Sequence, residues 1–161
     1  MAEETGYKLV EKLASDMEVR HYKKQTWVQD HNPDSNASYM KLLAYSEGQN
    51  KENRKVPQTV PVINGEDIKG PYVAFLIPCE IHNPPEPLDP EIEIRNVPER
   101  KLATISLSGL VSPESFDRDK RVLENTLKNR GIKIKNGPIF FQYNKPWTPP
   151  LEQKNEIAFE I

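Results

Sequence analysis

The hexapeptide MEVRHY at residues 17–22 and its partial repeat IEIRNV at residues 92–97 carry the pattern that decides the fold. In both segments an apolar residue alternates with a charged one, which is the two-residue period of a half-buried β-strand. This alternation predicts that Glu18 and Arg20 pair with each other on a solvated face. The opposite, inner face of the first strand is expected to carry Met17, Val19 and His21.

Similar series of elements follow the two copies, in the order strand, helix, strand, strand, which indicates an internal duplication. The predicted halves cover about residues 7–82 and 91–161, and a proline-rich connector at residues 83–90 joins them. The inner faces of the two copies differ at one position, where His21 corresponds to Asn96. Two such halves should pair into one curved sheet with a helix from each half packed against it, a single α+β domain over residues 1–161.

Capping signals locate both helices. Asp34 or Ser35 can cap a helix over about residues 36–47, and Ser112 followed by a proline begins a second helix that ends near residue 130. The first helix is expected to bury a stripe formed by Tyr39, Met40, Leu43 and either Tyr45 or Ser46. The second is expected to bury Phe116, Leu123 and Leu127, joined by Val122. As an alternative, Phe116, Leu123 and Leu127 dock into the groove of a protein partner.

Composition excludes several classes of function. The formal net charge of −2, with scattered lysines and arginines, gives no reason to expect a nucleic acid or an anionic membrane as partner. No apolar run reaches the ~20 residues that span a bilayer, and the N-terminus lacks the pattern of a signal peptide. Cys79 is the only cysteine, so no internal disulfide can form, and a cytoplasmic location is expected. Without a nucleophile, zinc or phosphate-binding motif, the sequence predicts a protein that is not an enzyme.

Histidine is the residue type most open to a functional role. A neutral imidazole offers a lone pair that can bind a metal ion, so His21 is a candidate ligand. The alternative is a structural histidine that is hydrogen-bonded to the backbone. His31 and His82 are expected to lie in surface loops, because both stand near prolines.

Five segments, in the same order along the chain, resemble the SOUL family of haem-binding proteins. They are MEVRHY followed by Trp27-Val28, the KxxxTxPV pattern at residues 55–62, the FxIPxE-like run at residues 75–80, the PPxPxDP connector, and YNKPWTPPLEQKNEI near the end. The likeness extends from Tyr7 to Ile161. Gln58 replaces a methionine that is common in the family, and Gln153 and Lys154 stand where two arginines are frequent.

The resemblance implies an α+β fold, a distorted β-barrel flanked by two helices, that binds haem (or another tetrapyrrole) reversibly as a cytosolic carrier or buffer. In one branch of the family a histidine at the position of His21 is the proposed ligand of haem iron. In another branch the porphyrin is thought to lie in an apolar cleft beside the first helix. The corresponding residues here are Asn36, Tyr39, Met40 and Leu43, with Tyr143 and Lys154 from the final loop.

Two other functions stay open from the sequence. The duplicated architecture also resembles the effector domains of bacterial multidrug-responsive regulators, which implies a module that binds hydrophobic ligands in general. The second is an interaction module that uses the helix over residues 113–130. An unspecified protein partner is compatible with either reading.

Overall fold

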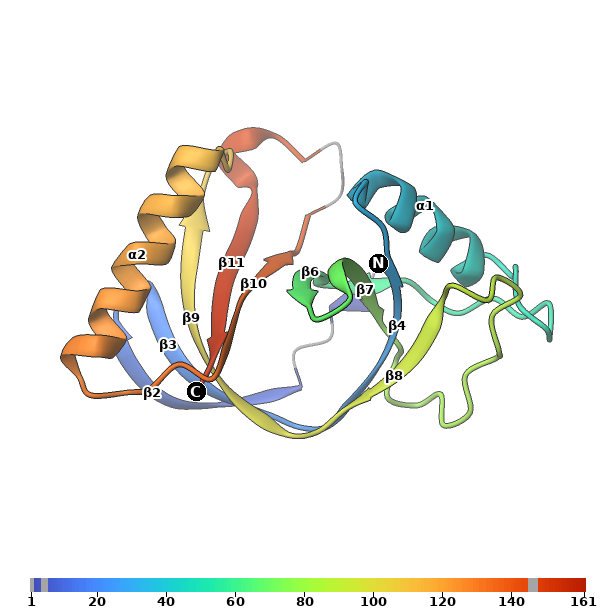
Figure 1. Ribbon diagram of the computed structural model, residues 1–161, viewed down its shortest axis with the longest axis horizontal. Helices are drawn as coiled ribbons and strands as arrows, with labels where there is room; N and C mark the ends of the chain where they lie inside the picture. Colours follow the sequence, from blue (N-terminus) through green and yellow to red (C-terminus); the bar gives the residue numbers. More distant parts are fainter. Residues whose placement is uncertain (1, 4–5, 145–147) are drawn as a thin grey trace. The chain divides into compact units, whose positions relative to one another are not determined.

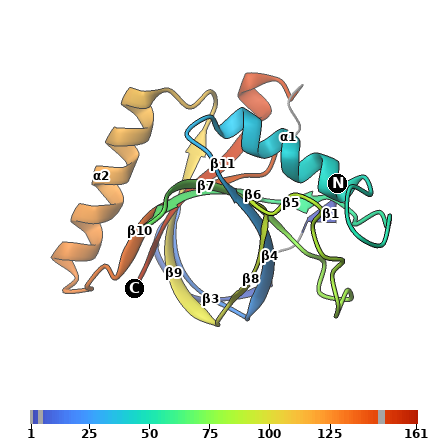
Figure 2. The same cartoon turned by 45° about the vertical axis from the view of Figure 1, so that its right-hand side comes forward.

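The computed structural model describes residues 2–3, 6–144 and 148–161, which form two compact units. Unit 1 comprises Lys24–Pro98 and the short strand β1 (Ala2–Glu3), and unit 2 comprises Gly6–Lys23 and Glu99–Ile161. Each unit contains an antiparallel sheet and one α-helix, so the predicted α+β class is confirmed. Both sheets are strongly curved (Figures 1 and 2), as the sheet of a distorted β-barrel is.

Unit 1 is built on a four-stranded antiparallel sheet in the order β6–β7–β4–β8. Helix α1 packs beside β7 and β4 (Figure 2), and β1 pairs in parallel with the short strand β5. The bounds of the elements are β4 (Gln25–His31), α1 (Ser35–Ser46), β5 (Thr59–Val60), β6 (Val62–Asp67), β7 (Gly70–Leu76) and β8 (Glu93–Val97).

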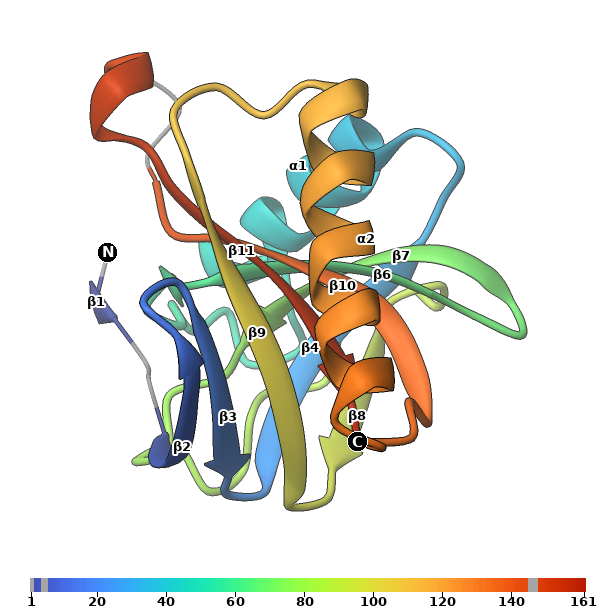
Figure 3. The same ribbon diagram turned by 90° about the vertical axis from the view of Figure 1, so that its left-hand side faces the viewer.

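Unit 2 contains a five-stranded antiparallel sheet in the order β2–β3–β9–β11–β10. Helix α2 lies along one face of this sheet (Figure 3). The bounds are β2 (Tyr7–Ala14), β3 (Met17–Tyr22), β9 (Arg100–Ser108), α2 (Pro113–Asn129), β10 (Asn136–Gln142), the 3-10 helix η1 (Pro150–Glu152) and β11 (Lys154–Glu160).

The two similar strands, β3 and β8, are exchanged between the predicted sequence halves. Strand β3 comes from the first half but pairs with β9 in unit 2, whereas β8 comes from the second half and pairs with β4 in unit 1. The β-branched and aromatic residues between Met17 and Trp27 predict one continuous strand, and this prediction is wrong, because β3 ends at Tyr22. The chain leaves unit 2 after Lys23, and β4 begins in unit 1 at Gln25.

Local capping explains where both helices begin. The Asp34 side chain accepts a hydrogen bond from the backbone N–H of Asn36 at 3.0 Å, and Ser112 and Ser115 form a reciprocal capping box. The predicted caps Asp34 and Ser112 are thus confirmed.

The buried face of α1 overlaps the predicted stripe only at Tyr45 and Ser46. Ser38, Leu42, Tyr45 and Ser46 are buried, whereas the side chain of Met40 is 61% exposed. The polar residue Ser38 is buried because its hydroxyl donates to the carboxylate of Asp30 at 2.7 Å, and Lys41 donates to the same carboxylate at 2.9 Å. A buried acid on β4 therefore decides which side of α1 faces the sheet.

Helix α2 uses its apolar face within unit 2. Leu123 and Leu127 are fully buried against β3, β9 and β11, and Phe116 packs edge-on against Phe140 with ring centroids 5.7 Å apart. Leu123 and Leu127 are therefore covered by the protein's own sheet and are not free to dock on a partner, and Phe116 is partly buried in the same cluster. Val122 was predicted to join this stripe, but it is 42% exposed. In the part of the chain that the structure describes, neither helix has the length and hydropathy that crossing a bilayer requires.

Candidate functional site

His21 lies near the end of β3, on the face of the sheet that α2 covers. Alternation along the strand places it with Met17 and Val19, both buried in the core beneath α2. The imidazole is 38% exposed, and its Nε2 atom is 3.7 Å from a carboxylate oxygen of Glu99, beyond hydrogen-bond range. Among the described residues no hydrogen bond engages the imidazole of His21, so the structure does not support the alternative of a side chain bonded to the backbone.

A groove of about 540 Å³ opens beside this imidazole. Its walls come from the start of β9, the end of β11 and the segment that follows α2. The backbone of Lys135 donates to the carbonyl of Glu160 at 2.7 Å, which holds the segment after α2 against β11. The lining residues are His21, Glu99, Arg100, Lys101, Ile132, Lys133, Lys135, Glu160 and Ile161.

The opposite face of the same sheet is also buried, which contradicts the predicted solvated face. Arg20 is 5% exposed and Glu156, on β11, is 1% exposed. Their side chains form a bidentate ion pair, with 2.8 Å between Nη1 and Oε1. Arg20 also donates to Glu18 at 2.9 Å, so the predicted pair exists but lies within a buried network. Its partner Glu156 was not predicted, because it is distant in sequence.

Aromatic hydroxyls complete this network. Nη1 of Arg20 donates to the Tyr22 hydroxyl at 3.0 Å, and the Tyr143 hydroxyl donates to Glu156 at 2.7 Å. Burial raises the pKa of Tyr22 to about 12, although the charge of Arg20 opposes the shift. Burial and the negative charge of Glu156 also raise the pKa of Tyr143. For Arg20, burial disfavours the charged form, but the hydrogen bond to Glu156 helps to raise its pKa above the usual value.

Tyr143 and Lys154 lie together in unit 2, apart from His21. The Nζ atom of Lys154 is 4.7 Å from the centroid of the Tyr143 ring, a cation–π contact. Both belong to the face that carries Arg20 and Glu156, whereas His21 lies on the α2 face. Residues 145–147 of the YNKPWTPP segment lie outside the described residues.

The four predicted cleft residues of α1 lie in unit 1. Asn36 and Met40 are exposed, while Tyr39 and Leu43 are half-buried. Tyr39 packs edge-on against Phe75 with ring centroids 5.3 Å apart, and its hydroxyl accepts a hydrogen bond from Gln58 at 3.1 Å. The helix thus offers an apolar surface around Met40 that a flat ligand could cover. A cleft formed jointly with Tyr143 and Lys154 stays a prediction.

Lys41, a possible cation for a ligand carboxylate, is already paired. Its Nζ atom lies 2.9 Å from Asp30, 3.3 Å from Asp89 and 2.9 Å from Glu91. Burial opposes its charge, but these carboxylates together raise its pKa. We therefore assign Lys41 a structural role.

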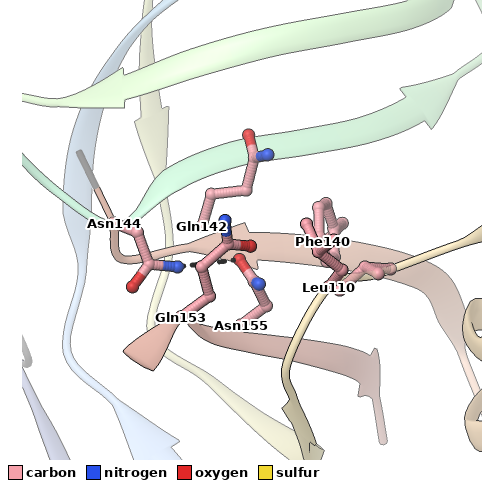
Figure 4. A pocket seen from close by; sticks show the side chains of 7 residues that line it. Leu110, Phe140, Gln142, Asn144, Gln153 and Asn155 are labelled. Carbon is pink, nitrogen blue, oxygen red and sulfur yellow. Dashed lines mark hydrogen bonds between the residues drawn. The ribbon is translucent and has the colours of Figure 1, made fainter. Parts of the chain in front are cut away.

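A smaller pocket of about 250 Å³ lies between β10 and β11 of unit 2. Figure 4 shows four carboxamide side chains gathered near one another, with Leu110 and Phe140 to one side: Gln142, Asn144, Gln153 and Asn155. Asn144 donates to the carbonyl of Lys154 at 2.7 Å and accepts from its N–H at 2.7 Å, so it holds the two strands together. This uncharged pocket offers neither an iron ligand nor a cation for a carboxylate.

Other candidate groups are placed as follows. His82 is exposed, as predicted. His31 instead ends β4, and its side chain is only 15% exposed because it contacts Asp67 at 2.9 Å and Tyr72 edge-on. Cys79 is exposed and forms no disulfide. In the described parts of the chain, no cluster of three histidine, cysteine or acidic side chains could hold a metal ion.

Sequence reasoning missed the lysines beside His21. Lys101 faces His21 across the β3–β9 ladder, and Lys133 and Lys135 follow the last turn of α2. The available signal is the alternation of isoleucine and lysine over residues 132–135, which places both lysines on one side of an extended segment. The approach of this segment to β3 depends on packing that the sequence does not display.

The residues beside His21 fit the requirements of a haem group. An accessible imidazole supplies a ligand of the kind that iron takes, and lysines supply cations for carboxylates. Ile132 and Ile161 add apolar surface to the groove. Fold and groove together define an α+β ligand-binding domain with a histidine at its rim. The chain belongs to the SOUL heme-binding protein family, whose model matches residues 2–160.

Curated relatives agree with this assignment, and solved structures share the fold. Heme-binding protein 2 of Homo sapiens and that of Mus musculus are each 26% identical over 156 residues, covering 87% of this chain and 75% of theirs. The structure of the EcmrR C-terminal domain has a TM-score of 0.63 at 14% identity and covers 96% of both chains. A structure described as a hydrolase from Listeria innocua has a TM-score of 0.62 at 10% identity and covers 89% of this chain and 90% of its own. Identities this low show the shared fold alone.

Proposed function

We propose that this protein binds haem or a related tetrapyrrole reversibly, as a carrier or buffer in the cytosol, with His21 as an axial ligand of the iron. The observation that carries the proposal is the accessible imidazole of His21 at the rim of a groove. Membership of the SOUL heme-binding family and the similarity to Heme-binding protein 2 support it. The haem would supply the iron and any redox chemistry, whereas the protein supplies the ligand, the cations and the apolar surface.

The described residues favour binding over catalysis. The buried charges of Arg20 and Glu156 neutralise each other, and buried Asp30 is paired with Lys41. Among the described residues, Glu99 is the one carboxylate within 4 Å of the His21 imidazole, and its side chain is 72% exposed. An exposed imidazole of this kind suits an exchangeable ligand, because iron can reach it and leave it without unfolding the sheet.

A haem titration followed by visible absorbance tests the proposal. We expect haem to give a shifted Soret band with the wild-type protein, and His21→Ala to change that band. His82→Ala, which removes an exposed histidine of unit 1, is the matched control and should leave the spectrum unchanged. Spectra that are identical for the wild type and His21→Ala would rule out ligation by His21.

A second candidate function is a binding module for flat hydrophobic ligands in general. Met40, which is 61% exposed on α1 beside half-buried Tyr39 and Leu43, favours this function because it offers apolar surface without an iron ligand. Such a module would bind iron-free porphyrin or a hydrophobic dye as well as haem. Met40→Glu would weaken the binding of all three ligands equally, whereas His21→Ala would change the binding of none of them.

A further inference from the structure

The charge of the groove beside His21 carries an inference about which tetrapyrroles it accepts. Three lysines, Lys101, Lys133 and Lys135, line the groove together with one carboxylate on the His21 side, that of Glu99. Arg100 and Glu160 also border the groove, but strand alternation places their side chains on the opposite face of the sheet, with Tyr22 and Glu156. The lining therefore has an excess of two positive charges in a protein whose formal net charge is −2. Such a local excess attracts anions.

The three lysines are not neutralised by the protein. Within the described part of the chain, Lys101, Lys133 and Lys135 form no ion pair, in contrast to Lys41, which contacts three carboxylates. Their ammonium groups are therefore able to pair with an anionic ligand. Charged hydrogen bonds of this kind are among the stronger polar contacts that a protein makes with a carboxylate.

The sheet register adds an independent observation. His21 pairs with Lys8 on β2 and with Lys101 on β9, so a lysine stands on each side of the imidazole across neighbouring strands. Cross-strand neighbours have Cβ atoms about 5 Å apart, which is within the reach of a lysine side chain. A carboxylate of a ligand bound at His21 therefore lies close to lysines on both neighbouring strands.

We propose that this groove selects tetrapyrroles by their ionised carboxylates, with Lys101, Lys133 and Lys135 as the specificity-determining residues. The inference rests on the proposed function, because it concerns the same His21 site. A macrocycle with free carboxylates meets the uncompensated lysines, whereas a neutral ester of the same macrocycle leaves them without a partner. The site thus discriminates by charge as well as by the iron bond.

The test compares haem with its dimethyl ester, which has the same iron and ring but no free carboxylates. We expect the wild type to bind haem at least tenfold more tightly than the ester, with affinity that falls as salt is added. Removing one exposed ion pair costs about two- to fivefold in affinity, so the triple variant Lys101→Gln/Lys133→Gln/Lys135→Gln should lose roughly 10- to 100-fold for haem and little for the ester.

A charge-matched control separates the groove from the overall charge of the protein. Lys51→Gln, Arg54→Gln and Lys55→Gln remove three exposed cations from the segment after α1 and should preserve the preference for haem. Circular dichroism spectra of both triple variants should match that of the wild type, which checks that the variants are folded. Equal affinity of the wild type for haem and its ester, with a Soret band that still depends on His21, would overturn the inference and leave the proposed function intact. If neither ligand gives a His21-dependent band, the proposed function itself fails.

Discussion

Removal of either partner of the buried Arg20–Glu156 pair should destabilise the protein strongly, and removal of both should cost no more than one. In Arg20→Met the carboxylate of Glu156 loses two hydrogen bonds and retains only the hydroxyl of Tyr143. In Glu156→Leu the guanidinium of Arg20 keeps its hydrogen bonds to the carboxylate of Glu18 and to the hydroxyl of Tyr22. Each single change leaves a charge in a site that is at most 5% exposed.

The magnitude follows from this burial. An unpaired charge left in such a site typically costs about 3–5 kcal/mol in the free energy of unfolding, and we expect about that for Arg20→Met. In Glu156→Leu the ion pair of Arg20 with Glu18 remains, so the cost should lie at the lower end, about 3 kcal/mol. The double variant leaves no unpaired charge, and two apolar side chains occupy the space. Its cost should therefore be about 3 kcal/mol or less, which gives a coupling energy of roughly 3 kcal/mol or more between Arg20 and Glu156.

Urea unfolding followed by circular dichroism measures all four proteins of this cycle. Glu156→Gln, a milder change in shape, keeps the test measurable if the leucine variant does not fold. The exposed pair Lys69–Glu93, at 2.8 Å, is the control and should show a coupling of about 0–1 kcal/mol. Additive effects at Arg20 and Glu156, within about 0.5 kcal/mol, would refute the view that the pair acts as one buried unit.

Three further predictions concern packing, pH and the apolar surface of α1. Leu127→Ala should lower the free energy of unfolding by about 2–5 kcal/mol, because its side chain is fully buried between α2 and the sheet of unit 2. Val122→Ala, at a site 42% exposed, should change the free energy of unfolding by less than about 1 kcal/mol in the same urea assay. Burial alone would raise the pKa of Asp67, but the hydrogen bonds from His31 and from the backbone of Lys69 lower it overall. A lowered folded-state pKa stabilises the protein above the unfolded value of about 4, and this contribution disappears as the pH falls through the folded value. Asp67→Asn should therefore cost about 1 kcal/mol at pH 6 and nearly nothing at about pH 2, and an equal cost at both pH values would contradict the assignment. Met40→Glu should weaken the binding of iron-free porphyrin in a fluorescence titration if α1 provides a binding surface, and unchanged binding would exclude that surface.

Local signals were sufficient to predict where the helices begin, but not which strands pair with each other. Asp34 and Ser112 cap their helices through hydrogen bonds within three residues, so the sequence displays both helix starts. The pairing of β3 with β9 depends on contacts across about 80 residues, and no local pattern reveals it. For this reason the segment from residue 17 to 27 looked like one strand, although the chain passes from one unit to the other within it.

The same limit applies to the site. Alternation correctly places His21 and Arg20 on opposite faces of β3. It does not reveal that the face with Glu18 and Arg20, expected to be solvated, is buried. Arg20 is buried because Glu156, 136 positions away, neutralises it. The groove lysines were missed because Lys133 and Lys135 reach His21 only through the packing of the segment after α2.

The most direct test of the central claim compares haem and iron-free protoporphyrin in titrations of the wild-type protein. The two ligands share the macrocycle and its carboxylates and differ in the iron that His21 would bind. We predict that haem binds at least about tenfold more tightly, which corresponds to a difference of ~1.4 kcal/mol, and that His21→Ala abolishes this difference. Equal dissociation constants for the two ligands in the wild type would contradict the account.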